Sequence, residues 1–340
     1  MNEILSVKPP SITILMSVYN GSRWLDDAIQ SVLYQTFTDF ELIIVNDGSK
    51  DQTLEIISGF ANDDRRIVVI DKPNTGLADS LNHGIRQARG GWIARIDADD
   101  LCVPDRIKKQ YELAQADSSL VLIGSGLLII DEHGQPGKSY QYPGIHKDIL
   151  NRLTTARSVF GHSSAFYRAD IAKALGGYRP RIKRSEDTDF WLRLSEVGRI
   201  ACLGAPLVKI RKHPGQISHD EQGRRQLIDS RVAIVSYWLR RRGFVDPVAD
   251  YSDVDFDIFS TWVAERLQQD RLFEYYAFVQ KIKQQLSAEG RTPTGFLRLF
   301  ALLLYEPGFV LRFLRQALVG ERLPKILAGA WIKRSKISAE

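Results

Sequence analysis

The chain has 340 residues, of which 44% are hydrophobic and 26% are charged, and this composition excludes general disorder. Only two cysteines occur, Cys102 and Cys202, which excludes a disulfide framework and fits a reducing compartment. The formal net charge is +5, and residues 291–340 hold nine Lys or Arg against three Asp or Glu, so the first 290 residues sum to −1. The basic character therefore belongs to the C-terminal part.

The first hundred residues alternate between short apolar runs and segments with helical spacing. Strands are expected at 11–18, 40–45, 67–70 and 92–96, with helices between them at 24–33, 51–60 and 77–88. Four such alternations predict an α/β fold built from parallel βαβ units with right-handed crossovers.

Polar residues stand at the carboxyl ends of three of these strands. Ser17 closes the first, Asp47 follows the second, and Asp97 follows the fourth. In an open parallel sheet these ends line one crevice, where ligands bind, so we expect the three side chains to converge.

Asp97 is the first of three closely spaced carboxylates, followed by Asp99 and Asp100. Clustered carboxylates repel one another, and a divalent cation such as Mn²⁺ or Mg²⁺ relieves that repulsion through oxygen ligands. The alternative is an acidic turn whose aspartates cap the next helix and face water.

After Arg106 the pattern predicts a helix through 107–113, a strand at 121–130, a hairpin turn at 131–137, a strand at 163–167 and a short helix at 169–175. A basic loop, 179–184, precedes a further helix that begins near Ser185. Its first turn presents Glu186 and Asp187, either as functional acids or as charges that complement the helix dipole. Phe190, Trp191 and Leu194 would face the core.

Five short motifs together resemble family 2 glycosyltransferases of the GT-A fold. They are Ser17-Val18-Tyr19-Asn20, Asn46-Asp47-Gly48-Ser49, Asn74-Thr75-Gly76, Asp97-Ala98-Asp99-Asp100 and Glu186-Asp187. The resemblance covers about residues 11–218. It implies a mixed, mostly parallel sheet flanked by helices, and a catalytic domain at 1–218 followed by a helical region at 219–340.

The resemblance also implies roles for individual residues. Asp47 matches the residue that reads the uracil of a UDP-sugar, although Asn46 replaces the aspartate that usually precedes it. The other residues of the implied nucleotide site are Ser17, Tyr19, Asn20, Asn74, Gly76, Asp97 and Asp99. Asp99, Asp100 and His213 would bind the metal. Asp187 would be the general base, with Glu186 as its acidic neighbour.

Four further residues are candidates for contacts with phosphate or acceptor. Arg181 and Arg184 in the basic loop could clamp a phosphate, or the loop could simply be solvated. His162 could contact the acceptor, with a structural histidine as the alternative, and Trp191 is the fourth candidate.

The C-terminal part predicts helices at 227–238, 256–267, 272–286 and 296–305, followed by a basic, aromatic segment at 309–337. We expect residues 296–337 either to associate with a membrane surface or to pack as a helical cap on the catalytic domain or a second subunit, which leaves a homo-oligomer open. No nucleic-acid motif occurs. The N-terminus has no signal-peptide pattern and no stretch is apolar enough to span a bilayer, so we expect a cytoplasmic protein, peripheral on the inner face of the membrane.

The resulting hypothesis is an inverting, metal-dependent transfer of a sugar from a nucleotide-sugar to a glycan or lipid-linked glycan in bacterial surface polysaccharide or lipopolysaccharide synthesis. A nucleotidyltransferase is an alternative, but it requires a glycine-rich phosphate loop that the stretch after Val18 matches poorly. A non-catalytic nucleotide-binding scaffold is the other, and the presence of all the acidic residues disfavours it. A dinucleotide-dependent oxidoreductase is disfavoured because no Gly-x-Gly-x-x-Gly follows the first strand.

Overall fold

The computed structural model describes residues 8–213, 223–269 and 322–334. The chain divides into two compact units. The first comprises Met1–Leu153 and Arg157–Asp220, and the second comprises Thr154–Ala156 and Glu221–Glu340.

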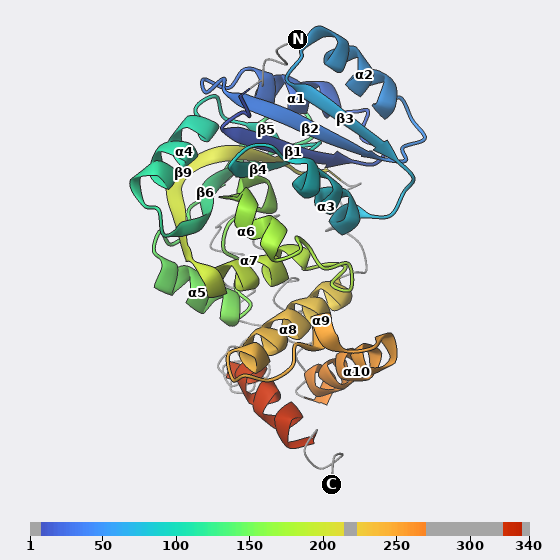
Figure 1. Ribbon diagram of the computed structural model, residues 1–340, viewed down its shortest axis with the longest axis vertical. Helices are drawn as coiled ribbons and strands as arrows, with labels where there is room; N and C mark the ends of the chain where they lie inside the picture. The colour runs from blue at the N-terminus through green and yellow to red at the C-terminus, as the bar shows by residue number, and fades with distance from the viewer. Residues whose placement is uncertain (1–7, 214–222, 270–321, 335–340) are drawn as a thin grey trace, which may run out of the picture. The chain divides into compact units, whose positions relative to one another are not determined.

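The first unit contains a sheet whose strands alternate with helices (Figure 1). The strands are β1 (Ile12–Val18), β2 (Phe40–Asp47), β3 (Ile67–Lys72), β4 (Trp92–Asp97), β5 (Leu101–Cys102), β6 (Leu120–Ile130), β7 (Pro136–Tyr140), β8 (Phe166–Arg168) and β9 (Arg199–Arg211). The helical segments up to β9 are α1 (Leu25–Leu33), α2 (Thr53–Asp63), α3 (Leu77–Gln87), α4 (Arg106–Ala116), α5 (His146–Thr154), the 3-10 turn η1 (His162–Ser164), α6 (Ala169–Ala174) and α7 (Glu186–Val197).

The sheet has the strand order β3-β2-β1-β4-β8-β6-β9-β5, and β7 pairs with β6. Strands β3, β2, β1 and β4 are parallel, β8 runs antiparallel to both β4 and β6, and β6 and β9 are again parallel. This mixed α/β sheet confirms the predicted fold class, and the hairpin expected at 131–137 connects β6 to β7.

Strand β1 is buried on both faces because helices cover both sides of the sheet. Ile12, Ile14 and Met16 pack in one core with residues of α1, α2 and α4. Leu15 points to the other side, where α3 approaches so closely that a Cβ on Gly84 would lie 2.1 Å from the Leu15 Cδ1. Burial on both faces explains why the parallel strands are continuously apolar rather than alternating.

The second unit is helical in the part that the structure describes. It contains α8 (Gly223–Arg240), α9 (Pro247–Asp250), α10 (Asp253–Gln269) and an unlabelled helix at 322–334 (red in Figure 1). Helices α8 and α10 confirm the helices expected at 227–238 and 256–267, whereas those expected at 272–286 and 296–305 lie outside the described residues. Among the described helices, none combines the length and apolarity needed to cross a membrane.

The helix at 322–334 is amphipathic, and its apolar face is buried within the second unit. Leu323, Leu327 and Trp331 recur at four-residue spacing and are all at least nine-tenths buried. The Trp331 ring lies 5.0 Å from that of Phe259 and 4.9 Å from that of Trp262, both on α10. The apolar stripe of this helix therefore serves internal packing.

Candidate active site

Sheet register brings the polar strand ends of the first unit together, as the sequence predicted. Ser17 on β1 is paired with Asp97 on β4, and the adjacent Val18 is paired with Asn46 on β2. Asp47 is paired in turn with Lys72 at the end of β3. Residues about eighty positions apart in the sequence thus share one edge of the sheet.

Asp47 lies at the β2 end of this edge and is almost fully buried. Its carboxylate accepts hydrogen bonds from the backbone N–H groups of Thr75 and Gly76, each at 2.9 Å, and from the ammonium group of Lys72. Burial alone would raise the pKa of Asp47, but these hydrogen bonds outweigh it and hold the pKa below its ordinary value. Asp47 is therefore an ionised acceptor surrounded by donors.

Hydrogen bonds connect the turn that follows β1 to the turn that follows β2, beside Asp47. Asn20, which has a positive φ of 51°, accepts a hydrogen bond from the backbone N–H of Lys50 through its side-chain oxygen, and its own N–H donates to the Ser49 Oγ. Tyr19 is 53% exposed, so its ring is available for contact with a ligand. Asn74 is also exposed, and Gly76 adopts a φ of 95° before α3 begins.

Asn46, the departure from the usual family pattern, has a local explanation. Its side-chain amide donates to the Asp71 carboxylate at 2.7 Å, across the β2–β3 pair. An aspartate at position 46 would place two carboxylates against each other.

The three carboxylates after β4 form a compact group. Oxygen atoms of Asp97, Asp99 and Asp100 lie within 4.8 Å of one another. Burial, followed by the charge of Asp97, raises the pKa of Asp99, and the same causes hold the pKa of Asp100 well above its usual range. A set of hard oxygen donors whose negative charges repel one another fits a divalent cation.

Asp97 differs from the other two because a buried cation already pairs with it. Arg95, which is 1% exposed, points two guanidinium nitrogens at the two oxygens of Asp97. Although burial opposes ionisation, this pairing lowers the pKa of Asp97.

His213, predicted to be a metal ligand, lies beside Asp99. Its Nε2 is 3.0 Å from the Asp99 Oδ2, and its ring packs against that of Trp24 at a tilt of 37°, with the ring centroids 4.0 Å apart. The preceding strand reaches the same group, since the backbone N–H of Arg211 donates to the Asp100 Oδ1 at 2.9 Å. The end of β9 therefore contacts the acidic group directly.

Glu186 and Asp187 are the first two residues of α7. Both carboxyl groups lie close enough to Arg95 for an electrostatic interaction with its guanidinium group. Burial and the neighbouring charge of Asp187 raise the pKa of Glu186 to about 8. Burial also raises the pKa of Asp187, although the Thr188 backbone N–H, which donates to it at 2.6 Å, acts in the opposite direction. A carboxylate with a raised pKa is a stronger base than an exposed one.

His162 connects this pair to an aromatic cluster. Its Nδ1 lies 3.9 Å from the Glu186 Oε1, and its Nε2 is 2.8 Å from the hydroxyl of Tyr178. Burial and the charge of Arg95 hold the pKa of His162 well below its ordinary value, so the imidazole is neutral. Trp191 packs in the same cluster and is only 1% exposed, as expected for a core residue rather than a surface contact for an acceptor.

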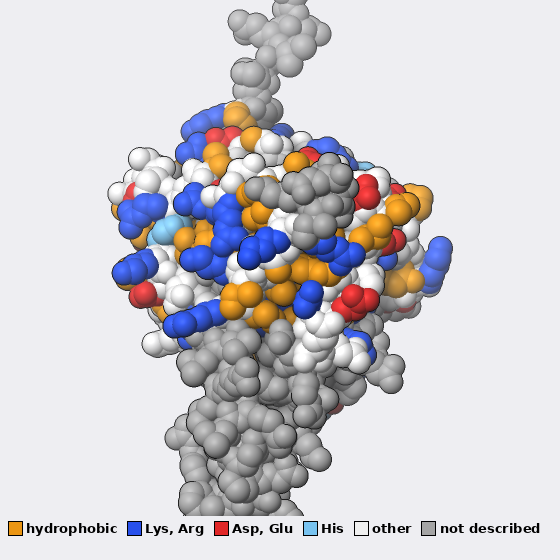
Figure 2. Space-filling view, turned by 90° about the horizontal axis from the view of Figure 1, so that it is seen from below, with side chains coloured by type: hydrophobic (Ala, Val, Ile, Leu, Met, Phe, Trp, Pro, Cys, Tyr) orange, Lys and Arg blue, Asp and Glu red, His pale blue; other side chains and the backbone are white. Residues whose placement is uncertain are grey.

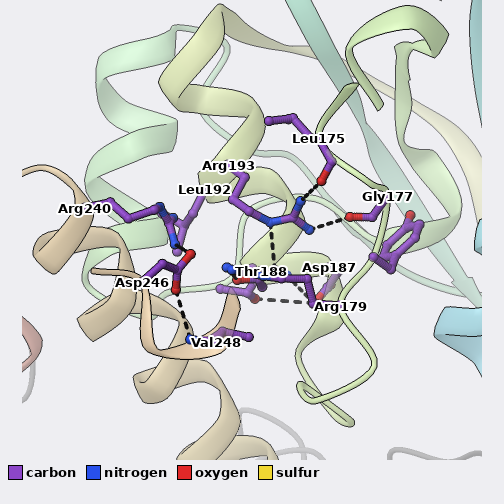
Figure 3. A network of polar contacts seen from close by, with 12 residues as sticks. Leu175, Gly177, Arg179, Asp187, Thr188, Leu192, Arg193, Arg240, Asp246 and Val248 are labelled. Carbon is purple, nitrogen blue, oxygen red and sulfur yellow. Dashed lines mark hydrogen bonds and ion pairs between the residues drawn. The ribbon is translucent and has the colours of Figure 1, made fainter. Parts of the chain in front are cut away.

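The loop before α7 is fixed by buried ion pairs. Arg193 donates to the carbonyl oxygens of Leu175 and Gly177, at 2.9 and 2.5 Å, as Figure 3 shows. Its Nε also bonds to Asp189 at 3.0 Å, and Asp189 pairs with Arg179 as well. One cation of the basic loop is therefore structural, while Arg181 and Arg184 are partly buried and engage other groups of the chain.

Comparison with known proteins identifies the family. Residues 13–176 match the family model for glycosyl transferase family 2. The chain is 36% identical over 208 residues to the putative glycosyltransferase EpsE of Bacillus subtilis, which covers 60% of this chain and 73% of that protein. The chain belongs to glycosyltransferase family 2.

A further relative agrees with this assignment, and a solved structure shares the fold. The O-antigen biosynthesis glycosyltransferase WbnJ of Escherichia coli is 30% identical over 184 residues, covering 54% of this chain and 71% of that one. The structure of S. aureus TarS in complex with UDP-GlcNAc has a TM-score of 0.57 at 20% identity, covering 76% of this chain and 72% of that one, and it shares the fold. The chain is thus a glycosyltransferase, and the nucleotidyltransferase and scaffold alternatives are set aside.

The sequence did not single out Arg95, Ser163, Lys72 and Tyr178, although each contacts a predicted site residue. Only Arg95 left a signal, because an arginine inside a buried apolar strand requires a buried partner. Ser163, Lys72 and Tyr178 reach the site residues only in the folded chain, so no local sequence pattern marks them.

Proposed function

We propose that this glycosyltransferase transfers a sugar, with inversion, from a UDP-sugar to a hydroxyl of a glycan or lipid-linked glycan during bacterial surface polysaccharide or lipopolysaccharide synthesis. The observation that carries the proposal is the convergence of Asp47, the Asp97–Asp100 group and the Glu186–Asp187 pair around one sheet edge. The role of WbnJ in O-antigen biosynthesis supports the acceptor class.

The donor base would be read at Asp47. The edge of uracil presents an N–H flanked by two carbonyl oxygens, which requires an acceptor flanked by donors. Asp47 supplies the acceptor, and Lys72 with the Thr75 and Gly76 backbone N–H groups donates to it and keeps it ionised. Cytosine has an acceptor where uracil has the N–H and would leave the buried carboxylate without that hydrogen bond, a mismatch that binding sites reject strongly. The exposed ring of Tyr19 would stack on the base.

Asp99 and Asp100 would hold Mn²⁺ or Mg²⁺, with His213 beside them. When bound, the cation supplies positive charge that stabilises the departing diphosphate. Asp187 would accept the proton of the attacking acceptor hydroxyl, and attack from the face opposite the leaving diphosphate gives inversion.

Calorimetric titration of the full chain with UDP, GDP and CDP, with and without Mn²⁺, tests this proposal. We expect UDP to bind most tightly, to require Mn²⁺, and to lose binding in Asp99→Ala. The matched control is Asp63→Ala, which removes an exposed carboxylate at the end of α2 and should leave binding unchanged. Preference for GDP or CDP would refute the role of Asp47, and no binding of any nucleotide by the folded protein would refute the donor site.

We also propose that the second unit contacts an anionic membrane surface through charge rather than through an inserted apolar stripe. The exposed side of the helix at 322–334 carries Arg322, Lys325 and Ile326. Arg242 lies 3.5 Å from a Cβ position on Gly329 of that helix, and Phe244, two residues after Arg242 in the chain, is exposed. Figure 2, which views the molecule from below, shows Lys and Arg side chains among hydrophobic ones on the face turned to the viewer, and this view includes residues outside the second unit. Such a combination favours anionic lipid.

Co-sedimentation with vesicles of phosphatidylcholine, with and without phosphatidylglycerol, tests this second proposal. We expect binding only to the anionic vesicles, with loss at high salt and in the double variant Arg322→Glu/Lys325→Glu. The control Arg86→Glu/Lys108→Glu reverses two exposed charges in the first unit and should bind normally. Equal binding by both double variants, or a change in oligomeric state instead of vesicle binding, would contradict the proposal.

A further inference from the structure

Arg95 is a buried cation at the centre of the site, and no role in the transfer reaction has so far been given to it. It lies two residues before Asp97 on β4, so both side chains project from the same face of the strand. Its two terminal nitrogens engage both oxygens of Asp97, and Nη1 also lies 3.0 Å from the Ser163 Oγ. Its Nε has no hydrogen-bond partner among the described residues.

Ser163 extends this arrangement to the rest of the acidic group. Its Oγ lies 2.8 Å from the Asp97 Oδ2 and 2.5 Å from the Asp100 Oδ2, and it accepts a hydrogen bond from the Asp97 backbone N–H at 3.1 Å. One hydroxyl thus joins Arg95 to two of the three carboxylates. Asp99, whose side chain is 29% exposed, is outside this set of contacts and has His213 as its partner.

These contacts divide the three carboxylates into two kinds. Asp97 has a full counter-ion, bound through both oxygens, whereas Asp99 and Asp100 have no arginine or lysine paired with their carboxylates among the described residues. Three free carboxylates would bind a divalent cation on their own, while two leave coordination positions to be filled by a substrate's phosphates. The pairing of Asp97 with Arg95 therefore determines how strongly the cation depends on the nucleotide.

We propose that Arg95 is a positioning residue of the donor site. It acts as the counter-ion of Asp97 and keeps that carboxylate from the cation, so that the cation binds through Asp99 and Asp100 and is completed by the donor diphosphate. This inference rests on the proposed function. It adds that the protein limits its own affinity for the free cation.

Opposite effects of two single variants test the proposal. Mn²⁺ binding to the full chain is measured by electron paramagnetic resonance, with and without UDP. In Arg95→Met, Asp97 loses its counter-ion, and we expect Mn²⁺ without UDP to bind about tenfold more tightly or better than in wild type. In Asp97→Asn, the uncompensated Arg95 repels the cation, and we expect Mn²⁺ to bind about tenfold more weakly. A purely structural role for Arg95 would weaken binding in both.

Two further variants keep the test decisive. Arg95→Lys retains the charge and should keep Mn²⁺ affinity near the wild-type value, and Arg95→Gln, which also removes the charge, replaces Arg95→Met if that variant does not fold. The control Arg89→Met removes an exposed arginine paired with Glu41 and should leave Mn²⁺ binding unchanged.

The outcomes separate this inference from the proposed function. If wild type shows no UDP-enhanced Mn²⁺ binding, the proposed metal-dependent donor site is wrong and the inference falls with it. If wild type shows the enhancement, but folded Arg95→Met binds free Mn²⁺ no more tightly or Asp97→Asn binds it no more weakly, the inference alone is overturned.

Discussion

The change Glu186→Gln should remove a large pH dependence of stability from this protein. Glu186 has a pKa of about 8 in the folded chain, against an ordinary value of 4.5. Because a difference of one in pKa corresponds to about 1.4 kcal/mol, the full difference corresponds to roughly 5 kcal/mol. The cause is burial, strengthened by the adjacent charge of Asp187.

The sign follows from the raised pKa. Between pH 4.5 and 8 the folded state holds a proton on Glu186 that the unfolded state has lost, so the free energy of unfolding falls as pH rises. The contribution is complete below about pH 4.5, decreases by about 1.4 kcal/mol per pH unit, and is lost as pH passes through about 8. Glutamine cannot ionise, so the variant should lack this slope and gain stability relative to wild type as pH rises.

The assay is urea unfolding of both proteins at pH 5 to 9, followed by fluorescence with Mn²⁺ absent. The difference in free energy of unfolding between wild type and Glu186→Gln should shift by several kcal/mol in favour of the variant across this range. The control Glu55→Gln removes an exposed carboxyl on α2, and its free energy of unfolding should change with pH in parallel with that of wild type. Parallel curves for Glu186→Gln as well would refute the argument that Glu186 is protonated at neutral pH.

Two other predictions concern the start of α7. Asp187→Asn should lower kcat by about 10² to 10⁴ through loss of the general base, while calorimetry should show UDP binding unchanged; an unaffected kcat would exclude Asp187 as the base. Asp189→Asn should destabilise the fold by about 3–5 kcal/mol, because it leaves Arg179 and Arg193 beside a neutral group in a buried site, and thermal melting of this variant beside the control Asp63→Asn measures the loss. A melting temperature equal to that of the control would show that the Asp189 ion pairs contribute nothing net.

Much of the fold could be predicted because local sequence signals agreed with one another. Apolar runs of strand length fixed β1 to β4, and their alternation with helices predicted parallel pairing. The same order placed Ser17, Asp47 and Asp97 at the carboxyl ends of strands, so their convergence required no knowledge of side-chain contacts. The roles assigned to the site residues through family resemblance remain predictions.

The second unit shows where sequence reasoning was incomplete. A basic, aromatic segment predicts an amphipathic helix, and the helix at 322–334 confirms that pattern. The sequence could not say what its apolar face meets. The structure packs Trp331 against α10, because a helix inside a folded unit buries its apolar face on whichever neighbour completes a core.

By itself, the sequence determined the order of the elements, the edge of the sheet that carries the site and the types of residue found there, because these follow from short-range periodicity and from strand direction. Tertiary structure decided which charges are paired. Strand spacing places Arg95 and Asp97 on one face, but Ser163, which connects Arg95 to Asp100, comes 68 residues after Arg95, so this network exists only after β4 and η1 have packed. Pairing of buried charges depends on distances and exclusion of water, and neither is encoded in residue order alone.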